Sequence, residues 1–278
     1  MEWIEIFKAI ILGIIEGITE WLPVSSTGHM ILVDEFLQLG MSPAFKEMFF
    51  VVIQLGAIMA VVLLYWKKIF PFNFSRKNNK PFVETDIIIM WIKIVIACVP
   101  AAVVGLLWDD QINALFYNFQ TVATMLIIFG ILFIVVENRN KGMRPKVTNM
   151  NQLTYKMAII IGLFQLIAAV FPGTSRSGAT ILGALMIGIS REVAAEFTFF
   201  LAIPVMFGAS LLKLVKFGFA FKSFELIVLG VGTIVSFVVS VWAIKFLMGY
   251  IKKHDFKIFG WYRIILGIIL LAYFFFMM

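Results

Sequence analysis

One stretch decides how this chain folds: residues 16–29, which read EGITEWLPVSSTGH. Apolar runs lie on both sides of it. Glu16 and Glu20 are four residues apart, so on a helix they share one face. Pro23 ends that helix, and either of the two serines that follow it is a good cap for a new one. The stretch is therefore expected to be a broken helix that brings polar groups into an apolar segment.

Composition indicates the class of protein. Of the 278 residues, 62% are hydrophobic and 14% are charged, and the mean hydropathy is +1.01. A soluble domain is roughly 45–50% apolar and about 25% charged, so an all-α polytopic membrane protein is expected. The net charge of +7 is interpreted as a topology signal and as contact with anionic lipid head groups, not with nucleic acid. The one cysteine, Cys98, is expected to pack among apolar groups.

Six apolar stretches are long enough to cross a membrane, which takes about 20 residues. They are 45–66, 86–108, 117–136, 192–215, 224–247 and 258–278. Two further apolar regions are interrupted: 3–39 at Pro23, and 153–189 at Pro172 and Gly173. Each interrupted region is expected to be a re-entrant pair of half-helices, because neither half is a full apolar span.

The two interrupted regions resemble each other. The run AIILG at 9–13 matches AIIIG at 158–162, an offset of 149. At that offset Glu16 falls on Gln165, Pro23 on Pro172, Ser25 on Thr174 and Ser26 on Ser175. We therefore expect one integral membrane domain, 1–278, built from two repeats of about 1–140 and 150–278.

Basic residues predict the orientation. The 67–85 and 137–156 segments carry five bases each and the 248–257 loop three, whereas 109–116 carries two aspartates and no base. Only the 213–223 loop, with three lysines, argues the other way. By the positive-inside rule the first three segments are cytoplasmic, so both termini are expected outside. The repeats then have inverted topology, with a site near the middle of the membrane.

A second motif, PGTSRSG at 172–178, precedes an apolar run. A turn rich in glycine and serine that opens a helix presents free N–H groups and the positive end of the helix dipole, which suits phosphate. Arg176 adds a planar charged group that fits phosphoryl oxygens. Both half-helix starts are expected to face one centre and bind a diphosphate through Ser25, Thr27, Gly173, Thr174, Ser175 and Ser177.

Structural interpretations compete with these functional ones. Glu16 and Glu20 would then form the solvated face of an interfacial helix, and His29 would cap or pack. Arg176 would serve to neutralise the two carboxylates. Three further cations within apolar spans are expected to extend to the membrane surface and are given no function: Lys93, Lys245 and Arg263.

No His-x-x-x-His or Cys-x-x-Cys spacing occurs in the chain. Glu16 and Glu20 offer carboxylate oxygens to a hard cation, so Mg²⁺ or another divalent cation is the cofactor that the sequence allows. No organic cofactor is expected.

These motifs closely resemble those of the bacterial undecaprenyl-diphosphate phosphatase family, also called the bacitracin-resistance protein family. The resemblance rests on EGITE at 16–20, LPVSSTGH at 22–29 and PGTSRSG at 172–178, with further landmarks at 53–57, 197–200 and 262–264. It implies a hydrolase of the bacterial cytoplasmic membrane that removes the terminal phosphate of undecaprenyl diphosphate. This reaction would recycle the lipid carrier of peptidoglycan synthesis at a site open to the outer face, and confer bacitracin resistance.

The expected catalytic residues are Glu16, Glu20, Ser26, His29 and Arg176. Ser26 attacks phosphorus with His29 as its base, Glu20 orients His29, and Arg176 stabilises the charge on the phosphoryl oxygens. Glu16 supports Arg176 or helps to bind Mg²⁺. In the rival mechanism His29 or Glu20 activates water, and Ser26 only binds phosphate. The alternative function is a secondary transporter or lipid flippase for a polyprenyl phosphate; the oligomeric state stays open, a dimer included.

Overall fold

The computed structural model describes residues 2–74, 81–218 and 221–277, and within these ranges the chain is helical with no strand. The elements are α1 (Glu2–Thr19), α2 (Ser26–Phe36), α3 (Pro43–Ile69), α4 (Thr85–Phe116), α5 (Phe119–Asn140), η1 (Met150–Gln152), α6 (Tyr155–Val170), α7 (Arg176–Met186), α8 (Arg191–Phe217), α9 (Ser223–Ile251) and α10 (Lys257–Met277). The expected all-α class is confirmed.

Six of these helices are long and apolar enough to cross a membrane, as the sequence predicts. They are α3, α4 as far as Trp108, α5, α8, α9 and α10. Their outer faces carry large exposed apolar side chains, among them Leu106 and Trp242, each 76% exposed. Apolar surface on this scale needs a cover other than water, so the chain is a multi-pass membrane protein.

The two interrupted regions form helix pairs, α1 with α2 and α6 with α7, each broken where the sequence predicts. The capping residues Ser25 and Ser175 have φ of 74° and 67°, and their side chains accept hydrogen bonds from the N–H groups of Gly28 and Gly178, both at 3.2 Å. Ser25 therefore corresponds to Ser175, not to Thr174 as the constant offset predicts. The second region has one more residue before its cap, so Ser26 corresponds to Arg176.

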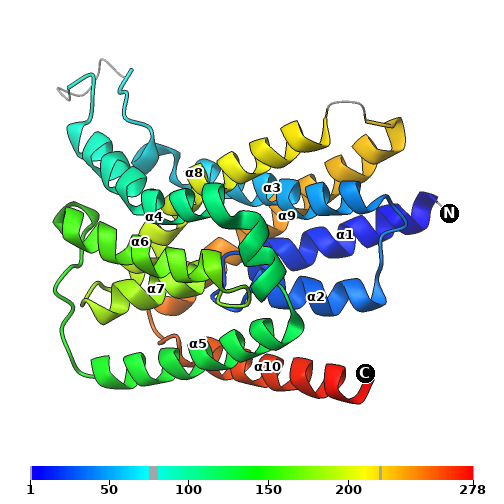
Figure 1. Ribbon diagram of the computed structural model, residues 1–278. Helices are drawn as coiled ribbons and strands as arrows, with labels where there is room; N and C mark the ends of the chain where they lie inside the picture. The colour runs from blue at the N-terminus through cyan, green and yellow to red at the C-terminus, as the bar shows by residue number, and fades with distance from the viewer. Residues whose placement is uncertain (1, 75–80, 219–220, 278) are drawn as a thin grey trace.

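The helix pairs approach one another from opposite ends of the molecule. In Figure 1, α1 and α2 lie on the side of the two termini, α6 and α7 lie on the other side, and the two breaks meet between them. Helix α1 packs against α9, and α6 against α4. These contacts are close: a Cβ at Gly13 would lie 2.7 Å from the Gly232 oxygen, and one at Gly162 would lie 2.5 Å from the Ala97 oxygen. Small residues allow helices in membranes to approach this closely.

The connections separate into two groups at the ends of the bundle. The described residues 67–74 and 81–85, with the 137–156 and 248–257 segments, lie at the end away from the termini (Figure 1). Residues 75–80, with three of the five bases counted in the first segment, fall outside the described ranges.

The 109–116 segment, which lies between two predicted spans, is expected to be a loop, and this expectation is wrong. It continues α4 to Phe116 beyond a non-helical residue, Trp108.

Candidate active site

The side chain of Glu20 lies where the two breaks meet. Its Oε2 accepts a hydrogen bond from Ser26 Oγ at 3.0 Å, and its Oε1 accepts one from Arg176 Nη2 at 2.9 Å. Its backbone oxygen accepts a third from Ser177 Oγ at 3.1 Å. The expected proximity of the two motifs, about 150 residues apart in sequence, is confirmed by this ion pair.

Arg176 is the first residue of α7, so its guanidinium lies beside the positive end of that helix. Nη1 donates to the backbone oxygen of Thr198 at 3.0 Å, which fixes the plane of the guanidinium against α8. The remaining donor, Nε, is buried without a hydrogen-bond partner in the described part of the chain. A fixed guanidinium with donors to spare suits the oxygens of a phosphoryl group.

Glu16 is the second carboxylate of the site and is only 1% exposed. Its Oε1 is buried without a hydrogen-bond partner among the described residues, as are both side-chain polar atoms of Gln165. Buried polar groups are normally paired, so the Glu16 oxygen is open to a further group. Within the described ranges, no cluster of three or more His, Cys, Asp or Glu side chains could hold a metal alone.

His29 is bonded away from Ser26. Nδ1 lies 2.7 Å from the backbone oxygen of Ser25, and Nε2 lies 2.6 Å from the hydroxyl oxygen of Tyr262. A carbonyl only accepts, so Nδ1 carries the proton, and in the neutral ring Nε2 accepts from the tyrosine hydroxyl. The two rings stack with centroids 5.5 Å apart.

The structure does not bring His29 against Ser26 or Glu20, because Ser26 bonds to Glu20 and His29 bonds to Tyr262; the role of His29 as the base for Ser26 stays a prediction. Ser26 and His29 both lie in the first turn of α2. The helix begins after Ser25, which has a positive φ, and the Ser26 side chain is directed back across the break to Glu20. The His29 side chain faces α10 instead.

Arg263 was expected to reach the membrane surface, and this expectation is wrong. The side chain is fully buried and donates to the backbone oxygens of both breaks: Pro23 at 3.3 Å, Gly173 at 3.0 Å and Thr174 at 2.6 Å. Breaking two helices leaves carbonyl groups without helical partners, and a guanidinium has enough donors for several of them. Two sequence signals point to Arg263: it is a cation within an apolar helix, and it lies in the family landmark at 262–264.

Lys93 and Lys245, the other two cations within apolar helices, differ in how exposed they are. Lys93 is 8% exposed, with its ammonium 5.7 Å from the centroid of the Tyr155 ring, so it does not extend to the surface as expected. Lys245 is exposed on α9, and its extension to the membrane surface stays a prediction.

The expected substrate-binding side chains are mostly engaged within the protein. Ser25 and Ser175 are caps, and Ser177 bonds to Ser175 and to the Glu20 backbone. Thr174 Oγ1 is buried and has no partner in the described ranges. Gly173 has φ of 90° and packs against the Val122 backbone, while Thr27 is half-buried at the start of α2. Through these caps Ser25 and Ser175 fix the starts of α2 and α7.

Comparison with known proteins assigns the family. Residues 9–269 match the model of the family described as "Bacitracin resistance protein BacA". The chain is 71% identical over 274 residues to the undecaprenyl-diphosphatase of Desulfitobacterium hafniense, covering 99% of this chain and 98% of that protein. It is 65% identical to undecaprenyl-diphosphatase 1 of Clostridium acetobutylicum, covering 99% of both, and 59% identical to an Enterococcus faecalis undecaprenyl-diphosphatase, covering 98% of both. The chain therefore belongs to the bacitracin resistance protein BacA family.

Proposed function

We propose that this protein hydrolyses undecaprenyl diphosphate to undecaprenyl phosphate and inorganic phosphate. The reaction recycles the lipid carrier of peptidoglycan synthesis and confers resistance to bacitracin. One observation carries the proposal beyond family membership: a serine hydroxyl and an arginine, contributed by two different broken helices, are both bonded to the same buried carboxylate. A nucleophile, a proton acceptor and a group that binds phosphoryl oxygens are thus within reach of one reacting atom.

In the first step, Ser26 Oγ attacks the terminal phosphorus. The Oγ–P bond forms, the hydroxyl proton passes to Glu20 Oε2, and the bond from phosphorus to the bridging oxygen breaks. Undecaprenyl phosphate leaves. Arg176 and the N–H groups at the starts of α2 and α7 stabilise the charge on the transferred phosphoryl oxygens. In the second step, the oxygen of a water molecule forms a bond to phosphorus and the Oγ–P bond breaks; Ser26 Oγ takes back the proton held by Glu20, and inorganic phosphate is released.

His29 serves the second step in this scheme. His29 is half-buried at the start of α2, where its Nε2 is held by the Tyr262 hydroxyl, and a water that displaces that hydroxyl can give up its proton to Nε2. The rival mechanism, in which His29 or Glu20 activates water directly and Ser26 only binds phosphate, uses the same residues. It is distinguished by the absence of a covalent intermediate.

A divalent cation such as Mg²⁺ would fit beside Glu16. The unpartnered Glu16 Oε1 supplies one hard oxygen ligand, and Mg²⁺ is commonly held by one or two carboxylates together with substrate phosphates. When bound, the cation would neutralise charge on the diphosphate. Binding of Mn²⁺ to purified protein with a diphosphate present, followed by electron paramagnetic resonance, should weaken in Glu16→Gln.

The two repeats are proposed to have inverted topology, with α6–α10 repeating α1–α5. This proposal is supported by the pairing of α1 with α9 and of α6 with α4, which inversion exchanges. The positive-inside rule then puts the end with the three basic segments in the cytoplasm. Both termini and the active site would then face outward.

Two experiments test the proposed function. Purified protein in detergent should release phosphate from undecaprenyl diphosphate, and Ser26→Ala should lose nearly all of that activity. Rapid acid quenching of wild type during turnover should trap phosphoserine at position 26. Near-full turnover by Ser26→Ala would contradict the covalent scheme. Failure of the wild type to release phosphate in detergent, where no gradient exists, would favour the alternative function, a secondary transporter or lipid flippase.

A further inference from the structure

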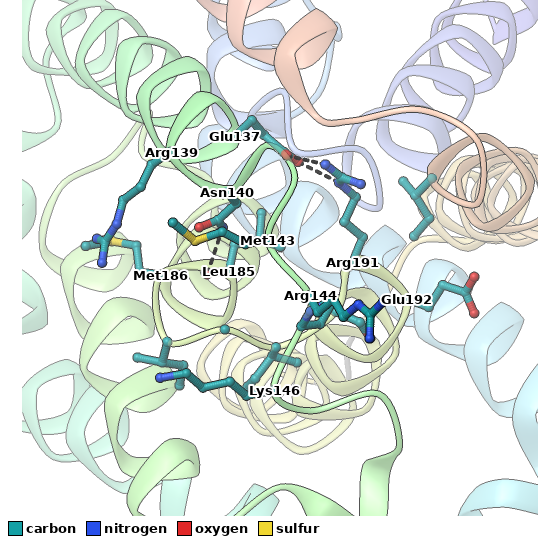
Figure 2. Close-up of a pocket in the computed structure, with 16 residues that line it drawn as sticks. Glu137, Arg139, Asn140, Met143, Arg144, Lys146, Leu185, Met186, Arg191 and Glu192 are labelled. Atoms are coloured by element: carbon teal, nitrogen blue, oxygen red, sulfur yellow. Dashed lines mark hydrogen bonds and ion pairs between the residues drawn. The ribbon is translucent and has the colours of Figure 1, made fainter.

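A cavity of about 360 Å³ lies at the end of the bundle away from the termini, apart from the site described above. Its walls are the last turn of α5, the segment 143–146, the turn 187–190 and the start of α8. Figure 2 shows Arg139, Lys146 and Arg144 around the cavity and Glu192 at its edge. Nothing in the proposed reaction uses these side chains.

The lining of the cavity is strongly basic. Arg139, Arg144, Lys146 and Arg191 line it, against the two carboxylates Glu137 and Glu192. Arg191 is already neutralised: its Nε donates to Glu137 Oε1 at 2.9 Å and its Nη2 to Oε2, and the Phe256 N–H donates to the same carboxylate at 3.0 Å.

The other three cations have no carboxylate partner within hydrogen-bond distance in the described part of the chain. Like charges placed around one small volume repel, and the C-terminal ends of α5 and α7 offset only about half a charge each. The positive end of the α8 dipole adds to the excess. An anion in the cavity would relieve this repulsion.

The walls are held in place by hydrogen bonds between segments distant in sequence. The Lys146 N–H donates to the Gly188 oxygen at 2.7 Å, and the Ser190 N–H donates to the Val147 oxygen at 2.8 Å. Asn140 Nδ2 donates to the Leu185 oxygen at 3.1 Å. The segment that carries the cations is therefore fixed to the turn before α8, and ordering it adds little cost on binding.

Apolar groups lie among the cations. Met143 is 62% exposed and Met186 is 40% exposed, and both line the cavity. A free inorganic anion has no apolar part that could contact the methionines. In a phospholipid, the phosphate can contact the cations while the adjoining glycerol and upper acyl carbons cover the methionines.

We propose that this cavity is a second anion site, which binds the phosphate group of an anionic phospholipid of the cytoplasmic leaflet. The site is separate from the catalytic one and takes a phosphodiester that the enzyme does not cleave. Its effect is to fix the α5 end, the 143–146 segment and the α8 start to one another and to the membrane surface.

The test compares two double variants in neutral detergent. Arg144→Gln with Lys146→Gln removes two of the unpaired cations, whereas Lys252→Gln with Lys253→Gln removes two exposed cations that do not line the cavity. Thermal unfolding is followed while phosphatidylglycerol, phosphatidylcholine of the same chains, or inorganic phosphate is added. Phosphate release from undecaprenyl diphosphate serves as the folding control, and both variants should retain it.

Phosphatidylglycerol should raise the Tm of wild type and of the control variant, and phosphatidylcholine should not. In the cavity variant, the concentration of phosphatidylglycerol that gives half of the increase in Tm should rise about thirty-fold, roughly fivefold for each cation lost. If inorganic phosphate alone reproduces the difference between the variants, the site binds a free anion and the lipid assignment is wrong. Equal responses of the cavity and control variants would overturn the site altogether.

Discussion

Glu20 is the residue on which the proposed chemistry depends, because its two carboxylate oxygens serve different partners. One accepts from the nucleophile and the other pairs with Arg176, so the charge that stabilises Glu20 comes from the other motif. An arginine or a glutamate alone in an apolar segment costs at least about 2.5 kcal/mol. Pairing reduces both penalties and leaves Arg176 able to exchange the carboxylate for an incoming diphosphate.

Replacing Glu20 by glutamine tests its role as proton acceptor. The amide still accepts a hydrogen bond from Arg176, so the fold should survive, but it cannot take a proton from Ser26. Phosphate release should fall by about two to four orders of magnitude. Glu2→Gln, the same change at an exposed position, should leave the rate unaltered; activity of Glu20→Gln within threefold of wild type would exclude Glu20 as the base.

Arg263 is proposed to position the two breaks, without contacting substrate. Arg263→Lys keeps the charge but replaces a guanidinium that reaches three backbone oxygens with one ammonium. Misplacement of Ser26 against Arg176 affects the transition state more than ground-state binding. We expect kcat to fall at least tenfold while KM changes less than threefold in steady-state assays of the folded protein. Lys245→Arg, an exposed change, is the control, and a loss confined to KM would assign Arg263 to substrate binding.

At the level of elements, the sequence predicts the six spans and both broken helices, since apolar length and a proline are local signals. It does not predict which side of each break a side chain faces. That direction is set by the positive φ of Ser25 and Ser175, which sequence spacing does not contain. The same limit explains why spacing alone predicts Ser26 beside His29, and why it gives no role to Arg263, which is far away on α10.

The second break should be sensitive to its glycine. Gly173 has φ of 90°, and a Cβ there would run into the backbone of Val122 on α5. Gly173→Ala should therefore lower the stability by more than the roughly 1 kcal/mol that a left-handed residue costs, visible as a reduced Tm in detergent. Gly105→Ala makes the same change within α4, where nothing lies within 4 Å, and helix propensity favours alanine there. A Tm of Gly173→Ala equal to that of Gly105→Ala would show that the break does not need this backbone conformation.

For the whole molecule, the contacts that matter join the two halves of the chain. Glu20 pairs with Arg176, Arg263 binds both breaks, and Glu137 bonds to Arg191 and to the start of α10. The contacts Glu20–Arg176, Pro23–Arg263 and Glu137–Arg191 each join a residue from the first 140 positions to one from the last 110 or so, and each is buried at least in part. Neither half would complete the candidate site by itself.

The orientation of this assembly gives the last prediction. Six spans, an even number, would return the chain to the side where it began, and the proposed re-entrant pairs would not change that count, so both termini are expected on one side. Basic segments gather at the opposite end, which the positive-inside rule makes cytoplasmic. In a Cys98→Ala background, Trp3→Cys should react with a membrane-impermeant maleimide in intact cells, because position 3 is exposed at the terminal end. Lys253→Cys, exposed at the basic end, should react only after permeabilisation. The reverse pattern would turn the candidate site toward the cytoplasm, and labelling of both positions from outside would mean that the two ends of the bundle do not lie across the membrane.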